Sequence, residues 1–424
     1  MKVCVVGLGK IGLPLSVQFA KSGFDVVGID ISENSVSLIN NGLAPFPGEP
    51  LLDTYLKEVL AQKKLTATSS YQQGVTDADV IVVLVPLIVD KQSVPNYVSI
   101  DSATTEIGKY LKKGALVSYE TTLPIGTTRN RFGKLLEEVS GFKAGVDFHL
   151  IFSPERVSSG RIFEDLKNYP KIVGGITKAC TDKGIGFYTK ALQFNVRNDL
   201  NRPNGVWAVE SSEASEFVKL AETTYRDVNI GLANQFAIHA TELSLNFSEI
   251  IESANSQPFS HIHTPGISVG GHCIPVYPHF YLVTDPKASI VKTARAQNAA
   301  MPEYYLEKIR SISKSLDGLH VLILGLAYRP NVKEHTFSGT LKLDEIINKE
   351  GGTALVLDPL YTDDEIKSHG LKPYANETNI DYVILHTGHV AFKDYDFTRF
   401  PNLKAVIDGR NFFPAAKESF PVIG

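Results

Sequence analysis

The hydrophobic pattern of the first third of the chain alternates between short apolar runs and stretches with helical spacing. Apolar residues at 3–6 and 25–29 indicate strands, and the apolar positions Leu15, Phe19 and Ala20 between them indicate a helix. Further strands are expected at 79–86 and 115–120, around a helix at 99–111. Strands that alternate with helices form parallel, doubly wound sheets, so this part of the chain is predicted to be a Rossmann-like domain.

The middle of the chain contains one long, uninterrupted helical pattern. Residues 210–245 include no proline and a single glycine, Gly231, so we expect a helix long enough to join two domains. One face of this helix is apolar, at Phe217, Ala221, Val228 and Leu232. The opposite face is polar, at Lys219, Thr223 and Arg226. The apolar face suggests a dimer interface, and the polar face is either a solvated surface or, through Lys219, part of a site that stabilises an oxyanion.

The last third begins like the first, with an apolar strand that ends at a glycine, Gly325. A helix is expected at 341–349, and strands are expected at 353–357, 382–385 and 405–407. This half has no GxGxxG sequence. The predicted fold class is therefore α/β, with two Rossmann-like doubly wound domains joined by a long central helix. The predicted domains are residues 1–205, 206–305 and 306–424.

Composition and charge narrow the class of protein. The chain has 424 residues, a formal net charge of −4 and three cysteines. This charge gives no electrostatic footprint for nucleic acid, and so few cysteines suit a reducing compartment. No apolar run approaches the roughly 20 residues of a membrane span, and the first apolar run is too short for a signal peptide. We expect a cytoplasmic protein that binds neither nucleic acid nor membranes.

The first strand leads directly into a GxGxxG turn that opens a helix. The candidate cofactor contacts in this turn are Gly7, Gly9, Lys10, Ile11 and Gly12. Glycines here let the main chain and the helix N-terminus approach a pyrophosphate. The next strand ends at Asp30, which would accept hydrogen bonds from a ribose hydroxyl and repel a 2′-phosphate. The turn predicts NAD rather than NADP, and the alternative is a glycine turn that serves only helix–strand packing.

Polar side chains follow two later strands, at the edge of the sheet where ligands bind. Thr121 and Thr122 offer hydroxyls beside a nicotinamide, and Glu155 offers a carboxylate. Pro86, which closes the strand at 79–86, is a further candidate cofactor contact. The alternative for the threonines and the glutamate is ordinary capping and turn chemistry.

Residues 265–278 hold three glycines and three prolines around a single cysteine, Cys273. A thiol in a stiff loop that a ligand can approach closely is a candidate nucleophile, and the alternative is a small buried residue in a turn. Cys4 lies in the first strand and Cys180 in an expected helix, so both are predicted to be packing residues. A zinc site is the other alternative, with ligands from His261, His263, His272 and His279 together with Cys273. Their spacing fits no standard zinc module, and we predict no metal.

Three basic residues in the last third are candidate phosphate contacts, namely Arg329, Lys333 and Arg410. The fork of an arginine matches phosphate oxygens. For each of them, a solvated surface position is the alternative.

Six motifs together resemble the UDP-sugar 6-dehydrogenase family, which includes UDP-glucose and UDP-N-acetylhexosamine dehydrogenases. They are VVGLGKIGLP, ETTLPIGT, SPERV, KLAETTYRDVNIGLAN, GISVGGHCIP and GLAYRPNVKE, and they span almost the whole chain. The resemblance implies an N-terminal NAD domain, a central helical segment that forms a homodimer, and a C-terminal UDP-binding domain. It also implies an active site between the two outer domains.

The implied reaction is a four-electron oxidation of a sugar C6 hydroxymethyl group to a carboxylate. Cys273 adds to the intermediate aldehyde, a second hydride leaves the thiohemiacetal, and water hydrolyses the resulting thioester. By resemblance, Lys219 stabilises oxyanion charge, and Thr122 and Glu155 handle water and protons. The implied substrate contacts are Glu155, Arg156, Lys219, Thr223, Arg226, His261, His263, Gly266, Gly270, Gly271, Arg329 and Lys333.

The chain departs from the family pattern at two positions. Thr223 stands where many members have asparagine, and Tyr277 stands where many have aspartate. Both departures affect the steps that involve the oxyanion and water. They put the usual route of thioester hydrolysis in doubt, or shift that step onto Glu155 and Thr122.

The SPER and GGHCIP motifs look more like the UDP-N-acetylmannosamine and UDP-N-acetylglucosamine dehydrogenases than the UDP-glucose branch. A role in making precursors of cell-surface polysaccharide follows from that branch. UDP-glucose remains the alternative substrate. Rivals of other classes are a non-catalytic sensor of NAD and UDP-sugar, which would need none of the catalytic residues, and a zinc-dependent alcohol dehydrogenase.

Overall fold

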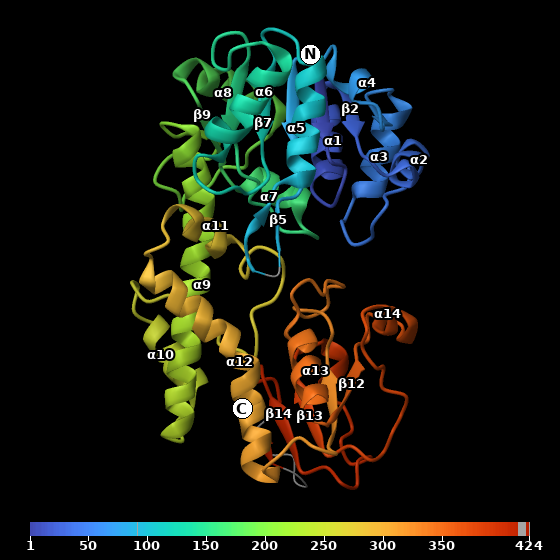
Figure 1. Ribbon diagram of the computed structural model, residues 1–424, viewed down its shortest axis with the longest axis vertical. Coiled ribbons are helices and arrows are strands. Elements are labelled where there is room, and N and C mark those ends of the chain that lie inside the picture. Colours follow the sequence, from blue (N-terminus) through green and yellow to red (C-terminus); the bar gives the residue numbers. More distant parts are fainter. Residues whose placement is uncertain (91, 414–420, 424) are drawn as a thin grey trace. The chain divides into compact units, whose positions relative to one another are not determined.

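The computed structural model describes residues 1–90, 92–413 and 421–423, and the chain divides into two compact units (Figure 1). The first unit consists of Met1–Glu222 and His279–Thr284, and the second of Thr223–Pro278 and Asp285–Gly424. Two helices, α9 (Ser212–Glu242) and α11 (Tyr277–Thr284), contribute residues to both units. The predicted domain boundaries at residues 205 and 305 stay a prediction, because the two compact units meet at other positions in the chain.

The first unit is built on an eight-stranded sheet with the order β10-β9-β8-β7-β4-β1-β2-β3. Its strands are β1 (Lys2–Val6), β2 (Asp25–Ile29), β3 (Leu65–Thr68), β4 (Val80–Val83), β7 (Leu116–Tyr119), β8 (His149–Phe152), β9 (Lys171–Gly175) and β10 (Val206–Ala208). The pairings are parallel except that β9 runs antiparallel to β8. An antiparallel strand toward one edge is common in doubly wound sheets. The strand order reverses beside β1, where such sheets bind their ligands.

Helices and short segments pack around this sheet. They are α1 (Gly12–Lys21), α2 (Glu33–Asn40), α3 (Leu52–Ala61), α4 (Tyr71–Val75), α5 (Val98–Tyr110), η1 (Thr128–Gly133), α6 (Lys134–Ser140), α7 (Ile162–Asn168), α8 (Lys178–Ala191) and the hairpin β5 (Ile88–Val89) with β6 (Pro95–Asn96). Strands β1 and β4 read as continuous apolar runs because helices cover both faces of the sheet. Cys4 and Cys180 are fully buried in β1 and α8, so their prediction as packing residues is confirmed.

The second unit contains a five-stranded parallel sheet with the order β12-β11-β13-β14-β15. Its strands are β11 (His320–Leu324), β12 (Thr353–Leu357), β13 (Tyr382–Leu385), β14 (Ala405–Asp408) and β15 (Val422–Ile423). The accompanying helices are α10 (Phe247–Asn255), α12 (Ser289–Ser313), α13 (Gly339–Lys349), α14 (Asp363–Ser368) and η2 (Val390–Phe392). The order again reverses beside the first strand, so the predicted fold class with two Rossmann-like domains is confirmed.

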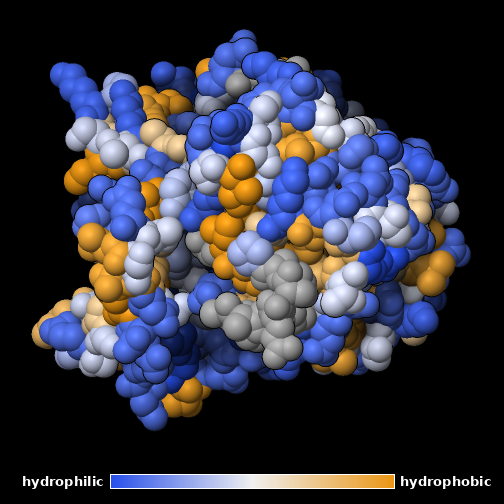
Figure 2. Space-filling view, turned by 90° about the horizontal axis from the view of Figure 1, so that it is seen from below, coloured by the Kyte–Doolittle hydropathy of each residue, from blue (hydrophilic) through white to orange (hydrophobic). Residues whose placement is uncertain are grey.

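Burial along α9 is the reverse of what its amphipathic pattern suggests. On the polar face, Lys219 is 8% exposed and Thr223 is fully buried, whereas Arg226 is exposed. On the apolar face, Phe217 is 46% and Leu232 is 44% exposed. Figure 2 shows that hydrophobic residues also reach the surface between hydrophilic ones on the face seen from below. Among the described residues, no helix is both long and apolar enough to cross a membrane.

Candidate active site

The GxGxxG turn has the geometry that a dinucleotide needs. Gly7 has a left-handed backbone with φ +96°, and a Cβ on Gly12 would overlap the carbonyl oxygen of Gly7. The two oxygens of Asp30 accept the N–H groups of Leu8 and Ser32, both at 2.9 Å. Its half-buried carboxylate therefore faces the turn and keeps lone pairs for a ribose hydroxyl. The residues present fit NAD.

The threonine-rich turn after β7 is held by a glutamate that the sequence did not single out. Glu216, near the start of α9, accepts the N–H groups of Gly126 at 2.5 Å and Thr128 at 2.8 Å. Burial raises the pKa of Glu216 to about 7. Thr121 donates to the main chain that follows β4, and Thr122 is 5% exposed. The turn therefore has a fixed conformation, with α9 as its support.

Glu155 follows β8 and is held by three donors. Its Oε1 accepts the N–H groups of Arg156 at 2.7 Å and Val157 at 3.1 Å, and its Oε2 accepts from Lys171 Nζ at 3.0 Å. Burial opposes ionisation, but Lys171 and the two N–H groups outweigh it and lower the pKa of Glu155. This side chain remains a carboxylate at neutral pH.

Behind Glu155 lies a second buried carboxyl group that the sequence analysis missed. Lys171 Nζ donates to Glu120 Oε2 at 2.6 Å, and the Tyr188 hydroxyl donates to Glu120 Oε1 at 2.5 Å. Burial raises the pKa of Glu120 to about 7, although Lys171 opposes the rise. Glu120 and Glu155 thus share one lysine, and of the two carboxyl groups Glu120 is the one that burial makes harder to ionise. Lys171 is the first residue of β9, and the local sequence gives no signal that it pairs with Glu120.

Lys219 and Arg156 are both predicted site residues, and the structure gives them different partners. Lys219 Nζ donates to the main-chain oxygen of Glu155 at 2.6 Å. Glu155 therefore contacts Lys219 through its main chain and Lys171 through its carboxylate. Arg156 forms an ion pair with Glu222 at 2.5 Å and donates to a main-chain oxygen. Lys219 is therefore fixed beside Glu155, whereas Arg156 is engaged in holding α9.

The Cys273 loop lies in the second unit and is anchored to its sheet. The thiol is half-buried, and the loop makes a main-chain bond from Gly271 N–H to Thr336 at 2.8 Å. Ser268 and His386 form a buried hydrogen bond of 2.8 Å. Burial lowers the pKa of His386 to about 3, so its ring is neutral. The loop is thus fastened to the residues that follow β11 and β13.

Glycines in this loop make room for neighbouring side chains. A Cβ on Gly270 would overlap the Cβ of Tyr328, and one on Gly271 would lie 2.9 Å from the Tyr328 ring. Tyr328 immediately precedes Arg329, so the segment carrying this phosphate candidate packs directly on the Cys273 loop. A Cβ on Gly266 would overlap the Arg410 guanidinium.

The basic candidates differ in how they are engaged. Arg410 donates to the main-chain oxygens of His386 at 2.8 Å and Ser268 at 3.3 Å, and burial lowers its pKa. Lys333 forms an exposed ion pair with Glu365 at 2.5 Å. Arg410 is therefore part of the anchoring of the Cys273 loop, and Lys333 lies on the surface.

The candidate histidines are near α9 in the second unit. Asn229 of α9 donates to the carbonyl of His261 at 2.9 Å and accepts the N–H of His263 at 2.8 Å. Burial lowers the pKa of His263, and the charge of Arg226 lowers it further. No group of three or more histidine, cysteine, aspartate or glutamate residues suited to a metal ion occurs among the described residues.

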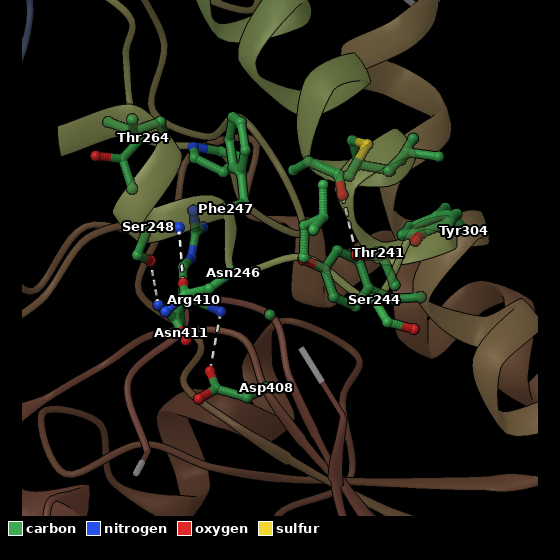
Figure 3. A pocket seen from close by; sticks show the side chains of 18 residues that line it. Thr241, Ser244, Asn246, Phe247, Ser248, Thr264, Tyr304, Asp408, Arg410 and Asn411 are labelled. Atoms are coloured by element: carbon green, nitrogen blue, oxygen red, sulfur yellow. Dashed lines mark hydrogen bonds between the residues drawn. The ribbon is translucent and has the colours of Figure 1, made fainter. Parts of the chain in front are cut away.

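A cavity of about 500 Å³ opens in the second unit (Figure 3). The end of α9, the start of α10, α12 and the turn after β14 form its walls. Asn411 and Ser248 bond across it, and the N–H of Arg410 donates to Asp408 at 3.0 Å. Cys273 does not line this cavity, which borders only the first residues of the Cys273 loop through Pro265.

The predicted site residues therefore fall into two groups. The first unit brings together Glu155 and Lys219 and contains the NAD turn and Thr122. The second unit brings together the Cys273 loop, the segment of Arg329, and the pair His261 and His263. Thr223 is buried on α9, and Arg226 is exposed there.

Comparison with known proteins agrees with the assignment of the NAD turn to the first unit and of the Arg329 segment to the second. Three domain models of the UDP-glucose/GDP-mannose dehydrogenase family match the chain. The NAD binding domain matches residues 1–192, the central domain 213–300 and the UDP binding domain 322–415. The matches occur in the same order along the chain as the predicted functions.

Curated relatives align over nearly the whole chain. The UDP-N-acetyl-D-mannosamine dehydrogenase of Pyrococcus horikoshii is 34% identical and covers 97% of this chain and 96% of its own. The enzyme of the same name from Campylobacter jejuni is 35% identical over 91% of each chain. The solved structure of the UDP-N-acetyl-mannosamine dehydrogenase Cap5O from S. aureus has a TM-score of 0.84 and 31% identity, covering 100% of this chain and 98% of its own. The protein is therefore a member of the UDP-glucose/GDP-mannose dehydrogenase family and an NAD-dependent nucleotide-sugar dehydrogenase.

Proposed function

We propose that this protein oxidises C6 of UDP-N-acetyl-D-mannosamine to the carboxylate, in the synthesis of a cell-surface polysaccharide precursor. The observation that carries the choice of substrate is that both relatives described above, aligned over at least 91% of the chain, bear this name. UDP-N-acetylglucosamine, its C2 epimer, is the first alternative, and UDP-glucose is the second.

Cys273 is the proposed nucleophile. The GxGxxG turn would hold NAD, which would supply the hydride acceptor for both oxidations. The Cys273 thiolate adds to the C6 aldehyde and forms a thiohemiacetal, and loss of the second hydride leaves a thioester. Water then displaces the thiol and gives the carboxylate. A covalent hold on the aldehyde allows two oxidations without release of the intermediate.

Lys219, Glu155 and Thr122 are proposed to serve the charged steps. The Lys219 ammonium, fixed by the Glu155 carbonyl, stabilises the negative oxygen of the adducts at C6. Glu155 stays ionised, so it accepts a hydrogen bond from the attacking water. The Thr122 hydroxyl is proposed to assist in handling this water. Tyr277 and Thr223 replace the residues that many family members use here, so thioester hydrolysis is expected to limit the rate.

The UDP portion is proposed to bind in the second unit. The UDP binding domain model covers residues 322–415, which include Arg329 and Lys333. The glycines of the Cys273 loop and the pair His261 and His263 are the proposed contacts nearer the sugar. Arg329 packs over the ring of Tyr328, which touches that loop, and this arrangement supports a shared role.

Turnover measurements test the function directly. The purified protein with NAD should produce NADH fastest with UDP-N-acetylmannosamine, and two NADH should form per sugar consumed. Preference for UDP-N-acetylglucosamine or UDP-glucose would correct the substrate, and no turnover on any of them would favour the non-catalytic sensor. Cys273→Ser should abolish steady turnover, because a hydroxyl is a far poorer nucleophile than a thiolate. Cys4→Ser and Cys180→Ser are the matched controls.

We also propose a cytoplasmic homodimer built on α9. Beyond the boundary between the units, α9 exposes Tyr225 (53%), Leu232 (44%) and Phe236 (43%) at helical spacing, and the exposed Leu243 (56%) follows its last residue. Apolar side chains exposed in a row on one helix favour a partner of the same kind. The cavity in Figure 3 adjoins the end of this row, because Leu245 and Phe247 line it.

Light scattering at micromolar concentration should give the mass of a dimer. Phe236→Glu should dissociate it, because a charge would be buried in the interface without a partner. Ile312→Glu, at a 45% exposed position on α12, is the matched control and should leave the dimer intact. A monomer in the unaltered protein would remove this proposal.

A further inference from the structure

The Cys273 loop is tied at both ends to one buried polar network in the second unit. At the first end, the Gly266 N–H donates to Asn234 Oδ1 at 2.9 Å. At the other end, the carbonyl oxygen of Pro275 accepts from Arg295 Nη1 at 3.2 Å. Asn234 lies on α9 and Arg295 on α12, so two different helices hold the ends of the loop.

Asp227 and Asn298 connect these two anchors. Arg295 Nε donates to Asp227 Oδ2 at 2.6 Å, and Asn298 Nδ2 donates to Asp227 Oδ1 at 2.8 Å. Asn234 Nδ2 donates to Asn298 Oδ1 at 2.9 Å. The side chains of Asp227, Asn234 and Asn298 are at most 2% exposed. Hydrogen bonds thus run without a break from one end of the loop to the other.

A glycine allows the two helices to carry this network. Gly231 lies between Asp227 and Asn234 on α9, and a Cβ there would be 3.2 Å from atoms of Ala294 on α12. This is closer than the roughly 3.5–4.0 Å of an ordinary carbon contact. The close approach brings short aspartate and asparagine side chains within hydrogen-bonding reach across the helix pair. The close packing of α9 against α12 therefore explains why position 231 of α9 is a glycine.

Stability alone is a weak explanation for this network. Replacing a buried ion pair with well-packed apolar residues is often neutral or stabilising. Burial raises the pKa of Asp227, and Arg295 opposes that rise, so the carboxylate depends on its partners. A fully satisfied buried network instead favours one geometry. Here that geometry includes the spacing between Gly266 and Pro275.

We propose that Asp227, Asn234, Arg295 and Asn298 are positioning residues that hold the Cys273 loop in the conformation from which its thiol attacks the substrate. This inference rests on the proposed function of Cys273 as nucleophile and adds to it a set of residues that support the loop from behind. Loss of either anchor would leave the loop to its remaining bonds, such as that from Gly271 N–H to Thr336, and let the thiol adopt several positions.

Three variants separate the two anchors. Asn234→Leu removes the anchor at Gly266, and Arg295→Met removes the anchor at Pro275. Arg295→Lys keeps a positive charge beside Asp227 but lacks the fork that reaches the loop at the same time. The matched control is Arg310→Met, on the same helix, because Arg310 pairs with three surface glutamates and not with the loop.

The first measurement needs no substrate. The full-length protein is treated with iodoacetamide from about pH 6 to 9, and mass spectrometry gives the alkylation rate of the Cys273 peptide. Cys4 and Cys180 are fully buried and serve as internal references. Asn234→Leu and Arg295→Met should alkylate Cys273 several-fold faster than the unaltered protein, with a changed pH profile. Arg310→Met should match the unaltered protein.

The second measurement is turnover. In the two anchor variants, kcat should fall by about tenfold to a hundredfold, since the nucleophile is displaced. KM for the UDP-sugar should change less than kcat, because Arg329 and Lys333 lie outside the loop. Hydroxylamine should trap more aldehyde, because the covalent step is the one that slows. Arg310→Met should keep its kcat.

Folded anchor variants with unaltered Cys273 alkylation and unaltered kcat would overturn the proposal. If Arg295→Met does not fold, the alkylation rate of Cys273 and the kcat of Arg295→Lys test the anchor at Pro275 instead. If the unaltered protein oxidises no UDP-sugar, the proposed function fails. The alkylation comparison still decides whether the network positions the loop.

Discussion

Strand β1 in the first unit and strand β11 in the second each run into a glycine with a left-handed backbone, Gly7 at φ +96° and Gly325 at φ +108°. In both cases the glycine N–H donates at 2.8 Å to the last residue of the next strand. In both, an aspartate follows that strand, Asp30 in the first unit and Asp358 in the second. The two sheets therefore start with the same turn.

The two aspartates differ in what they have left to offer a ligand. Asp30 accepts one N–H on each oxygen and is half-buried. Asp358 is 2% exposed, accepts three main-chain N–H groups, and contacts His389 Nε2 at 3.1 Å. The first carboxylate keeps lone pairs that a ligand can use, whereas the hydrogen bonds of the second fix the turn of the protein itself.

The helices that follow also differ. Helix α1 starts at Gly12, directly after the turn, so its N-terminal N–H groups are placed where they would contact the pyrophosphate of NAD. Helix α13 starts only at Gly339, after a loop of residues 326–338 that carries Arg329 and Lys333. The same strand–turn unit is thus followed directly by a helix N-terminus in one domain and by a loop with basic side chains in the other.

Replacing each aspartate with alanine should separate these roles most clearly. Asp358→Ala leaves buried donors without a partner, so the free energy of unfolding should fall by about 3–5 kcal/mol. Asp30→Ala should cost less than about 1 kcal/mol, because water replaces its partners. Urea denaturation followed by circular dichroism measures both. Equal losses would show that the two turns are alike.

The pH dependence of stability should have opposite signs in the two units. The pKa of Glu120 is raised from 4.5 to about 7, so the folded first unit keeps a proton that the unfolded chain has lost. Its stability should fall by at most roughly 3 kcal/mol as pH rises from about 4.5 to 7, and then level off. The pKa of Glu216 is also raised to about 7, so this group too lowers the stability of the folded protein as pH rises.

In the second unit, burial opposes ionisation of Asp358, but its hydrogen bonds lower the pKa of the carboxyl group. Its stabilising effect is complete above the unfolded pKa of about 3.9 and is lost as pH falls through the lower folded value. Urea titrations between about pH 3 and 8 test both slopes. Glu120→Gln should flatten only the neutral region, and Asp358→Ala only the acid region. A neutral slope unchanged by Glu120→Gln would contradict this assignment.

The first glycine of each following helix provides a third contrast. A Cβ on Gly12 would overlap Gly7, and a Cβ on Gly339 would overlap Ser268 of the Cys273 loop. Each alanine variant should lose roughly 1–3 kcal/mol of stability through overpacking. Gly12→Ala should raise KM for NAD, whereas Gly339→Ala should lower kcat and leave KM for NAD unchanged. Steady-state kinetics distinguishes these outcomes, and a raised KM for NAD in both variants would remove the contrast.

Cofactor choice should depend on the first aspartate alone. The unaltered enzyme should strongly prefer NAD over NADP, because Asp30 repels a 2′-phosphate. Asp30→Ala should lower the ratio of kcat/KM with NAD to kcat/KM with NADP by about tenfold, which corresponds to about 1.4 kcal/mol. Equal use of both cofactors by the unaltered enzyme would refute this role of Asp30.

Local pattern was enough to predict much of the fold and the cofactor. Strands β12 and β13 match their predicted ranges, and α9 begins and ends within three residues of the predicted helix. The GxGxxG turn and Asp30 are encoded within one short window. These features depend on side-chain periodicity and on the backbone freedom of glycine. Both act between near neighbours in the sequence, so the sequence alone is enough to predict them.

The groups around the reactive residues were decided only by the tertiary structure. Lys171 reaches Glu120 across 51 positions, and Glu216 reaches Gly126 across 90. Arg295 reaches Asp227 across 68. No local window contains both members of such a pair, and each residue alone looks like an ordinary surface charge.

Helix α9 shows the same limit. Its sequence determined that Lys219 and Thr223 share one face and that Phe217 and Leu232 share another, because helical geometry alone sets which side chains align. Which face becomes buried depends on what packs against it. In this protein the neighbours of α9 bury the polar residues Lys219 and Thr223 and leave Phe217 and Leu232 exposed.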